Sequence, residues 1–184
     1  MQGVGINQMS YYFQVCSSES YQDKYMIFLL EHYKELNLPY PFSISLSFLA
    51  SSVLMQKEAI LCFNDEDEVV GAIGYICGTA ENQYKDTHVA QIQIVFLVET
   101  YRRSRLFLES LQFLVQYISQ LPEPIVELRF WVPVHLRLQR LLAKLAVKTA
   151  TWDTAQGEID EYHANFKEWQ AYAMKFRHEA YFTS

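Results

Sequence analysis

The chain has few cysteines, and they lie far apart. Cys16, Cys62 and Cys77 are odd in number, follow no CxxC spacing and have no nearby histidine pair. This pattern argues against a disulfide framework and against a zinc site. Each cysteine lies among apolar residues, so we expect three buried free thiols and no bound metal.

The sequence also lacks segments that would direct it into a membrane. Residues 1–10 have neither the basic start nor the long apolar run of a signal peptide. No uninterrupted apolar stretch reaches the ~20 residues that a membrane-spanning helix needs. We therefore expect a cytoplasmic protein with no membrane partner.

Positive charge is scarce, since 15 Lys and Arg stand against 21 Asp and Glu and give a formal net charge of −6. This balance argues against nucleic acid as a partner and slightly favours a cationic substrate. Apolar residues are plentiful: 51% of the chain is hydrophobic and 15% aromatic, which is too apolar for disorder. No repeat or linker divides the 184 residues, so we expect one domain.

Hydrophobic periodicity predicts both strands and helices. Strands are expected at 11–16, 59–63, 69–77, 88–98, 126–132, 150–153 and 159–166. Helices are expected at 20–35, 43–56, 107–121 and 135–146, and again after 166. The acidic turn 64–68 makes a hairpin of its two flanking strands. The order predicts an α/β (α+β) domain with a mixed sheet.

The most informative segment is a basic turn, Tyr101-Arg102-Arg103-Ser104-Arg105, between a strand and a helix. The first N–H groups of a helix lack intrahelical partners, and the helix dipole adds positive potential there. Arginine side chains add planar donors that suit phosphate oxygens. The segment therefore predicts a site for a phosphate-bearing cofactor. The helix that follows has an apolar stripe at Phe107, Leu111, Leu114, Ile118 and Leu121.

This order of elements resembles the GNAT superfamily of acyl-CoA-dependent N-acetyltransferases. The family signature Gln/Arg-x-x-Gly-x-Gly/Ala aligns with Arg102-Arg103-Ser104-Arg105-Leu106-Phe107. A second element, Asn-x-x-Ala-x-x-Leu-Tyr-x-Lys-x-Gly-Phe, aligns without gaps with residues 135–147. Agreement there, in type or identity, comes from Leu138, Leu141, Lys144 and Leu145.

The signature departs from the family pattern at both of its small residues, which are Arg105 and Phe107 here. Glycine suits such turns because the backbone must approach the pyrophosphate closely. Arg105 can extend outward and leave its N–H free, and we expect the ring of Phe107 to point under the sheet. The backbone site for the pyrophosphate can therefore persist.

The resemblance implies a mixed, mostly antiparallel sheet of six to seven strands flanked by helices. It also implies acetyl-CoA as co-substrate and a primary amine of a small molecule or peptide as acceptor. The backbone of Leu97, Val98 and Glu99 would pair with the pantetheine amides, and an N–H near Leu97 or Val98 would polarise the thioester. His135 would contact the pantetheine arm or thiol. The pyrophosphate would be held by Arg102, Arg103, Ser104, Arg105, Leu106 and Phe107.

Catalytic groups are harder to place. In many relatives a carboxylate on the fourth strand accepts the proton of the amine, and a tyrosine of the second element protonates the thiolate. Gln93 and Leu142 stand at these positions. An amide cannot accept a proton, so Gln93 is expected either to orient a water or the amine or to be a polar strand-edge residue. Other candidates for acid or base are Glu99, His88, Asp160, Glu161, His163, Tyr162 and Tyr172.

Three functions stay open on this basis. The first is an active acetyltransferase, the second a catalytically inactive GNAT-fold protein that binds CoA or another ligand. The third is an unrelated α/β module whose basic turn contacts a protein. The last helix has an aromatic face that either packs on its own domain or forms a homodimer contact. This face consists of Phe166, Trp169, Tyr172 and Phe176.

Overall fold

A computed structural model describes residues 10–55, 58–134, 139–140 and 142–182. Its strands are β1 (Tyr12–Val15), β2 (Ala59–Phe63), β3 (Val69–Cys77), β4 (Val89–Leu97), β5 (Glu127–Pro133), β6 (Val147–Thr154) and β7 (Gly157–Asn165). Its α-helices are α1 (Glu19–Glu31), α2 (Tyr33–Leu36), α3 (Phe42–Leu54), α4 (Leu106–Ile118) and α6 (Phe166–Met174). The expected helix at 135–146 falls partly outside the described residues.

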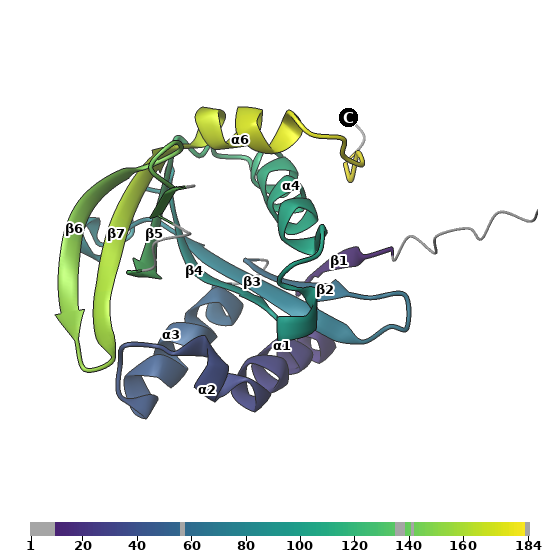
Figure 1. The fold of residues 1–184 in the computed structure, drawn as a ribbon, viewed down its shortest axis with the longest axis horizontal. Coiled ribbons are helices and arrows are strands. Elements are labelled where there is room, and N and C mark those ends of the chain that lie inside the picture. Colours follow the sequence, from purple (N-terminus) through teal and green to yellow (C-terminus); the bar gives the residue numbers. More distant parts are fainter. Residues whose placement is uncertain (1–9, 56–57, 135–138, 141, 183–184) are drawn as a thin grey trace, which may run out of the picture.

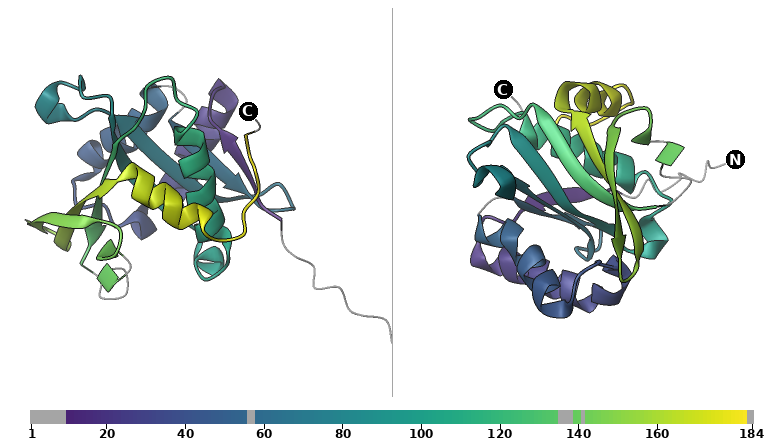
Figure 2. Two further views of the ribbon diagram at one scale, coloured as in Figure 1. Left: turned by 90° about the horizontal axis from the view of Figure 1, so that it is seen from above. Right: turned by 90° about the vertical axis from the view of Figure 1, so that its left-hand side faces the viewer.

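The strands form one seven-stranded sheet in the order β1-β2-β3-β4-β5-β7-β6. Only β4 and β5 pair in parallel; the other neighbours are antiparallel. Helices α4 and α6 lie over one face and α1–α3 over the other (Figure 1), and the turned views show the same layers (Figure 2). The prediction of a mixed, mostly antiparallel sheet flanked by helices is confirmed.

The β2–β3 hairpin forms where the sequence predicts it. Its strands are apolar and nearly fully buried, and the polar residues between them make the turn. The Asn64 side chain accepts hydrogen bonds from the backbone N–H groups of Glu66 (3.0 Å) and Glu68 (2.9 Å). Such a local side-chain bond favours a turn over a continued strand.

Gly74 on β3 allows α1 and α3 to approach the sheet closely. A Cβ at this position would lie 2.2 Å from the Tyr25 hydroxyl oxygen and 2.6 Å from Ser52 Oγ. With any larger residue, the side chains of Tyr25 and Ser52 would have to shift. The glycine therefore brings a serine of α3 down to the neighbouring strand β4, where it contacts the candidate site described below.

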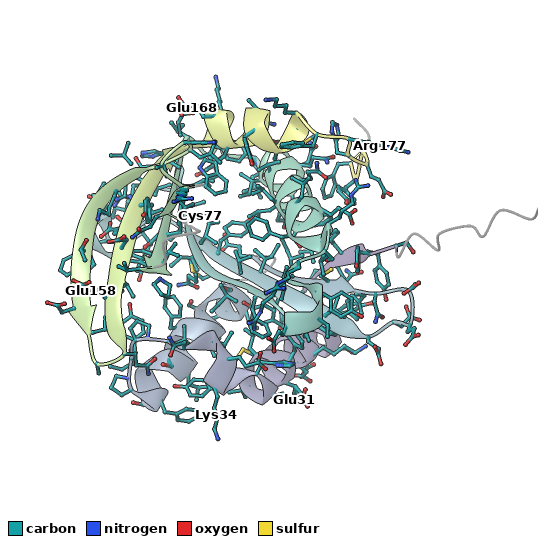
Figure 3. The ribbon with its side chains drawn as sticks, in the orientation of Figure 1. Glu31, Lys34, Cys77, Glu158, Glu168 and Arg177 are labelled. Carbon is teal, nitrogen blue, oxygen red and sulfur yellow. The ribbon has the colours of Figure 1, made fainter. Side chains whose placement is uncertain are left out.

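Helix α6 packs on its own sheet. Phe166 and Ala173 are buried, and the Trp169 ring lies edge-on to Phe130 with centroids 5.4 Å apart. The expectation that the aromatic face contacts its own domain is met, although Phe176 stays 40% exposed. Figure 3 shows Glu168 and Arg177 pointing outward from this segment.

The three cysteines are free thiols. Cys16 and Cys62 are buried, and Cys77 is half-buried on the inner side of the sheet near α4 (Figure 3). No cluster of three potential metal ligands occurs among the described residues. Within the same residues, no helix has both the length and the hydropathy to cross a bilayer.

Glu58 gives a first prediction, on pH and stability. Its Oε2 is buried and has no hydrogen-bond partner within the described chain. Burial raises the pKa of this carboxyl to about 7, against a smaller opposing effect of the Cys77 thiol. Because the folded-state pKa lies above the unfolded value of 4.5, protonated Glu58 stabilises the fold fully below pH 4.5. That stability is lost as the pH rises through 7.

Glu58→Gln should therefore stabilise the protein at pH 8 and leave its stability nearly unchanged at pH 4. Partial solvent exposure reduces the expected gain to on the order of 1–2 kcal/mol. Urea unfolding at both pH values measures the free energy of unfolding. An equal difference between variant and wild type at pH 4 and pH 8 would contradict the assignment.

Candidate active site

Strands β4 and β5 separate part-way along their length and border a cavity. They pair from Val89 opposite Glu127 to Ile92 opposite Phe130, and beyond this point both continue without pairing to each other. A cavity of about 480 Å³ lies along the separated ends. Its wall includes residues of α4 on one face of the sheet and residues 35–40 with Phe48 on the other. The cavity therefore passes through the sheet.

Gln93 lies at a β-bulge that points it to this cavity. Ile94 is opposite Gly74 and Ile92 is opposite Tyr75, so Gln93 has no partner on β3. Its Oε1 accepts hydrogen bonds from the hydroxyls of Ser51 (2.6 Å) and Ser52 (3.0 Å) on α3. These bonds fix the amide of Gln93 in the cavity wall. Its catalytic role stays a prediction.

The Arg102 side chain bonds to other residues of the same chain. Its Nε donates to the carbonyl oxygen of Leu97 at 2.8 Å, and its Nη2 pairs with Glu35 Oε2 at 3.0 Å. The guanidinium also lies 5.4 Å from the ring centroid of Phe96. The side chain thus connects the end of β4 to α2. Its predicted contact with phosphate stays a prediction, and Nε and Nη2 of the guanidinium already have partners within the chain.

The turn before α4 offers several unpaired backbone donors. Among the described residues, no acceptor pairs with the N–H groups of Arg103, Arg105 and Phe107. Ser104 N–H donates to Tyr101 O at 3.0 Å, and Leu106 N–H donates to Ser104 Oγ at 3.1 Å. Three of the five predicted amides are therefore available to an anion, and two are used within the turn.

All three arginines of this turn are exposed, and two of them are not tied to Glu35. Arg103 is exposed, and Arg105 keeps a loose ion pair with Glu109 at 3.6 Å. Phe107 is 39% exposed and lines the cavity, so the expected position of its ring under the sheet is not found. The predicted phosphate-binding segment and the cavity are therefore adjacent, because Phe107 belongs to both.

Several backbone groups at the end of β4 already have partners. Leu97 O accepts from Arg102, Val98 N–H donates to Val70 O at 3.0 Å, and Val98 O accepts from Tyr101 N–H at 2.9 Å. Val98 N–H is thus not free to polarise a thioester. The side of β4 that faces β5 has no strand partner beyond Ile92, so a ligand could add there as a short strand.

His135 lies outside the described residues, and Leu142 is buried in the cavity wall. Glu99, His88, Asp160, Glu161, His163, Tyr162 and Tyr172 do not belong to the described wall. Asp160 is buried, and although burial opposes it, hydrogen bonds from Thr151 and Gln139 keep the pKa of its carboxyl below the usual value. Thr151 and Lys148, which bond to Asp160, both lie on β6, so these contacts connect β6 with β7.

Charged side chains are few in the described wall of the cavity, where Glu35 and Arg102 pair with each other. A hydrogen bond with His32 is the main cause that lowers the pKa of Glu35, and Arg102 adds to it. Glu35 is therefore a poor proton acceptor. Sequence reasoning missed both Glu35 and the wall residues of 36–40, because no local motif marks them.

Known structures share this fold. A GNAT-family acetyltransferase from Staphylococcus aureus has a TM-score of 0.60 at 14% identity, with 85% of this chain and 99% of that chain covered. Ard1 from Thermoplasma volcanium has 0.62 at 12%, covering 84% and 97%. A ribosomal-protein alanine acetyltransferase from Vibrio fischeri has 0.61 at 13%, covering 86% and 94%.

No protein-family model matches the sequence, and a comparison with curated proteins gave no match. At 12–14% identity the similar structures establish the fold alone. This chain has the fold of the GNAT acetyltransferases, as its sequence resemblance implied.

Proposed function

We propose that this protein transfers an acetyl group from acetyl-CoA to a primary amine of a small molecule or peptide. The observation that carries the proposal is the cavity between the separated ends of β4 and β5, beside a helix N-terminus with unpaired N–H groups. The acetyltransferases of the same fold support it. The free thiols support a reducing, cytoplasmic location.

Different residues of this chain would bind the cofactor and orient the reacting amine. The N–H groups and side chains of Arg103 and Arg105, with Phe107 N–H, would hold the pyrophosphate. The open edge of β4 from Ile94 would pair with the pantetheine arm. Gln93 would orient the attacking amine or a water. The neutral amine nitrogen attacks the thioester carbon and forms the new C–N bond. The C–S bond breaks, and CoA leaves as its thiolate. The amine gives up one proton to water, and water returns a proton to the thiolate.

A second candidate is a protein that binds CoA without catalysis. It is favoured by the absence of a free acid or base in the described cavity wall, where Glu35 is paired and Leu142 replaces the tyrosine of the family. Turnover of acetyl-CoA against a panel of amines separates the two candidates, because only the first one predicts product.

Gln93→Ala should lower the turnover of acetyl-CoA by about tenfold, the effect of one lost positioning hydrogen bond, and leave the affinity for CoA unchanged. Gln93→Glu should raise the rate or shift its pH dependence, since a carboxylate can accept the proton. Ser47→Ala is the matched control, because Ser47 bonds only to Ser43 O on the exposed side of α3. If Gln93→Ala keeps full turnover at every pH, the residue is structural.

A further inference from the structure

The two ends of the cavity face different reactants. The proposed pyrophosphate turn lies at the start of α4, and Phe107 belongs to both this turn and the cavity wall. The donor would therefore enter from the α4 face of the sheet. The part of the wall on the opposite face, which we call the acceptor wall, is left for the amine. It consists of Leu36, Leu38, Pro39, Tyr40, Phe48 and Ile159.

The acceptor wall offers little to a charged ligand. Its members are aliphatic, aromatic or proline side chains. The polar residues of the cavity wall beside them are the amides of Asn37 and Gln93 and the ion pair of Glu35 with Arg102. Gln93 Oε1 already accepts two hydroxyl hydrogen bonds. An ammonium group in this part of the cavity would lose its water without gaining an unpaired anionic partner in the described wall, because Glu35 is already paired with Arg102.

The nearby carboxylates do not make the binding of an ammonium group more favourable. Glu35 is paired with Arg102 at 3.0 Å and with His32 at 2.8 Å. Glu31 and Glu158, on the elements next to the acceptor wall, point away from the centre of the molecule in Figure 3. A cationic substrate, which the composition slightly favours, does not fit this wall.

We infer that the acceptor is an apolar amine that carries no charge besides its reacting nitrogen. This inference rests on the proposed acetyl transfer and narrows its substrate class. The apolar surroundings favour the neutral form of the amine, which is the nucleophilic form. They thereby compensate for the lack of a free general base in the described cavity wall, because the amine loses its proton on leaving water. Polyamines lie outside the class, since their second ammonium would be buried without a partner.

The test compares hexylamine with hexamethylenediamine, which has the same carbon chain and one more ammonium. Trp131 and Trp169 line the cavity, so tryptophan fluorescence reports binding without turnover. In the presence of saturating CoA, hexylamine should bind at least about tenfold more tightly than the diamine. Acetyl-CoA assays should give the same preference in kcat/KM.

Leu38→Asp should make the affinities for hexylamine and hexamethylenediamine similar. A carboxylate in the acceptor wall can pair with the second ammonium of the diamine. Tyr40→Asp, at a site that is 38% exposed, makes the same test if Leu38→Asp does not fold. Leu54→Asp is the control: Leu54 is 78% exposed on α3 and outside the cavity wall, so it should keep the wild-type preference.

The outcomes are distinct. Equal or tighter binding of the diamine by the wild-type protein, or no binding of either amine, would overturn the inference. Preferred binding of hexylamine with no acetylated product would support the ligand class and reject acetyl transfer. Preferred binding together with product supports both.

Discussion

Replacing Arg103 and Arg105 together by alanine should weaken the binding of CoA by more than about tenfold. Each charge-assisted hydrogen bond to a phosphate contributes ~1.5–3 kcal/mol, and exposure to solvent reduces the effect of a single one. Both side chains are exposed beside the unpaired N–H groups of the turn. Isothermal titration calorimetry measures the dissociation constant of the variant and of the wild type.

The matched control is Lys167→Ala with Lys175→Ala. These lysines are exposed on and after α6, and their loss changes the net charge by the same amount. CoA affinity should stay at the wild-type level in this control and should fall with added salt in the wild type. An unchanged affinity in the Arg103 and Arg105 variant would count decisively against the turn as a phosphate site.

The sequence predicts the elements around the site well because their signals are local. Strands β2 and β3 have the predicted bounds, since each is an apolar run that ends at polar turn residues. The order of strand, basic turn and helix at 92–118 is also confirmed. The placing of the phosphate cradle at this turn stays a prediction, supported by the unpaired N–H groups.

The partners of the site residues could not be predicted, because they are far apart in the sequence. Arg102 pairs with Glu35, 67 residues away, and so contacts α2 where the resemblance implied phosphate. Ser52, which bonds to Gln93, fits against the sheet because Gly74 has no side chain. No periodicity within one segment contains this information.

The sequence also did not predict the details of helices α1, α2 and α3. The single helix expected at 20–35 is divided at His32 into α1 and α2. Helix α3 buries two serines, Ser45 and Ser52, together with Leu49, and exposes several large apolar residues, a mixture that an amphipathic pattern does not predict. The Ser52 hydroxyl bonds to Gln93 of β4, so this buried serine has a polar partner on the sheet.

Removal of α6 should abolish folding, which is the largest effect expected in this protein. Phe166 and Ala173 are buried, and Trp169 donates from Nε1 to Leu145 O at 2.9 Å. Gln112 of α4 also donates to Ala173 O at 3.0 Å. Each buried aromatic side chain contributes on the order of 1.5–3 kcal/mol, so several together approach the whole stability of a domain, ~5–15 kcal/mol.

A protein ending at Asn165 should therefore be insoluble or unfolded, as judged by circular dichroism and sedimentation. Single substitutions in α6 and just after it measure how much individual side chains contribute to stability. Trp169→Ala should cost ~3–5 kcal/mol in urea unfolding, whereas Phe176→Ala, at a 40% exposed site, should cost less than about 1 kcal/mol. A folded monomer obtained from a dimeric parent would instead assign the aromatic face to a homodimer contact, because the core would then be complete without the helix.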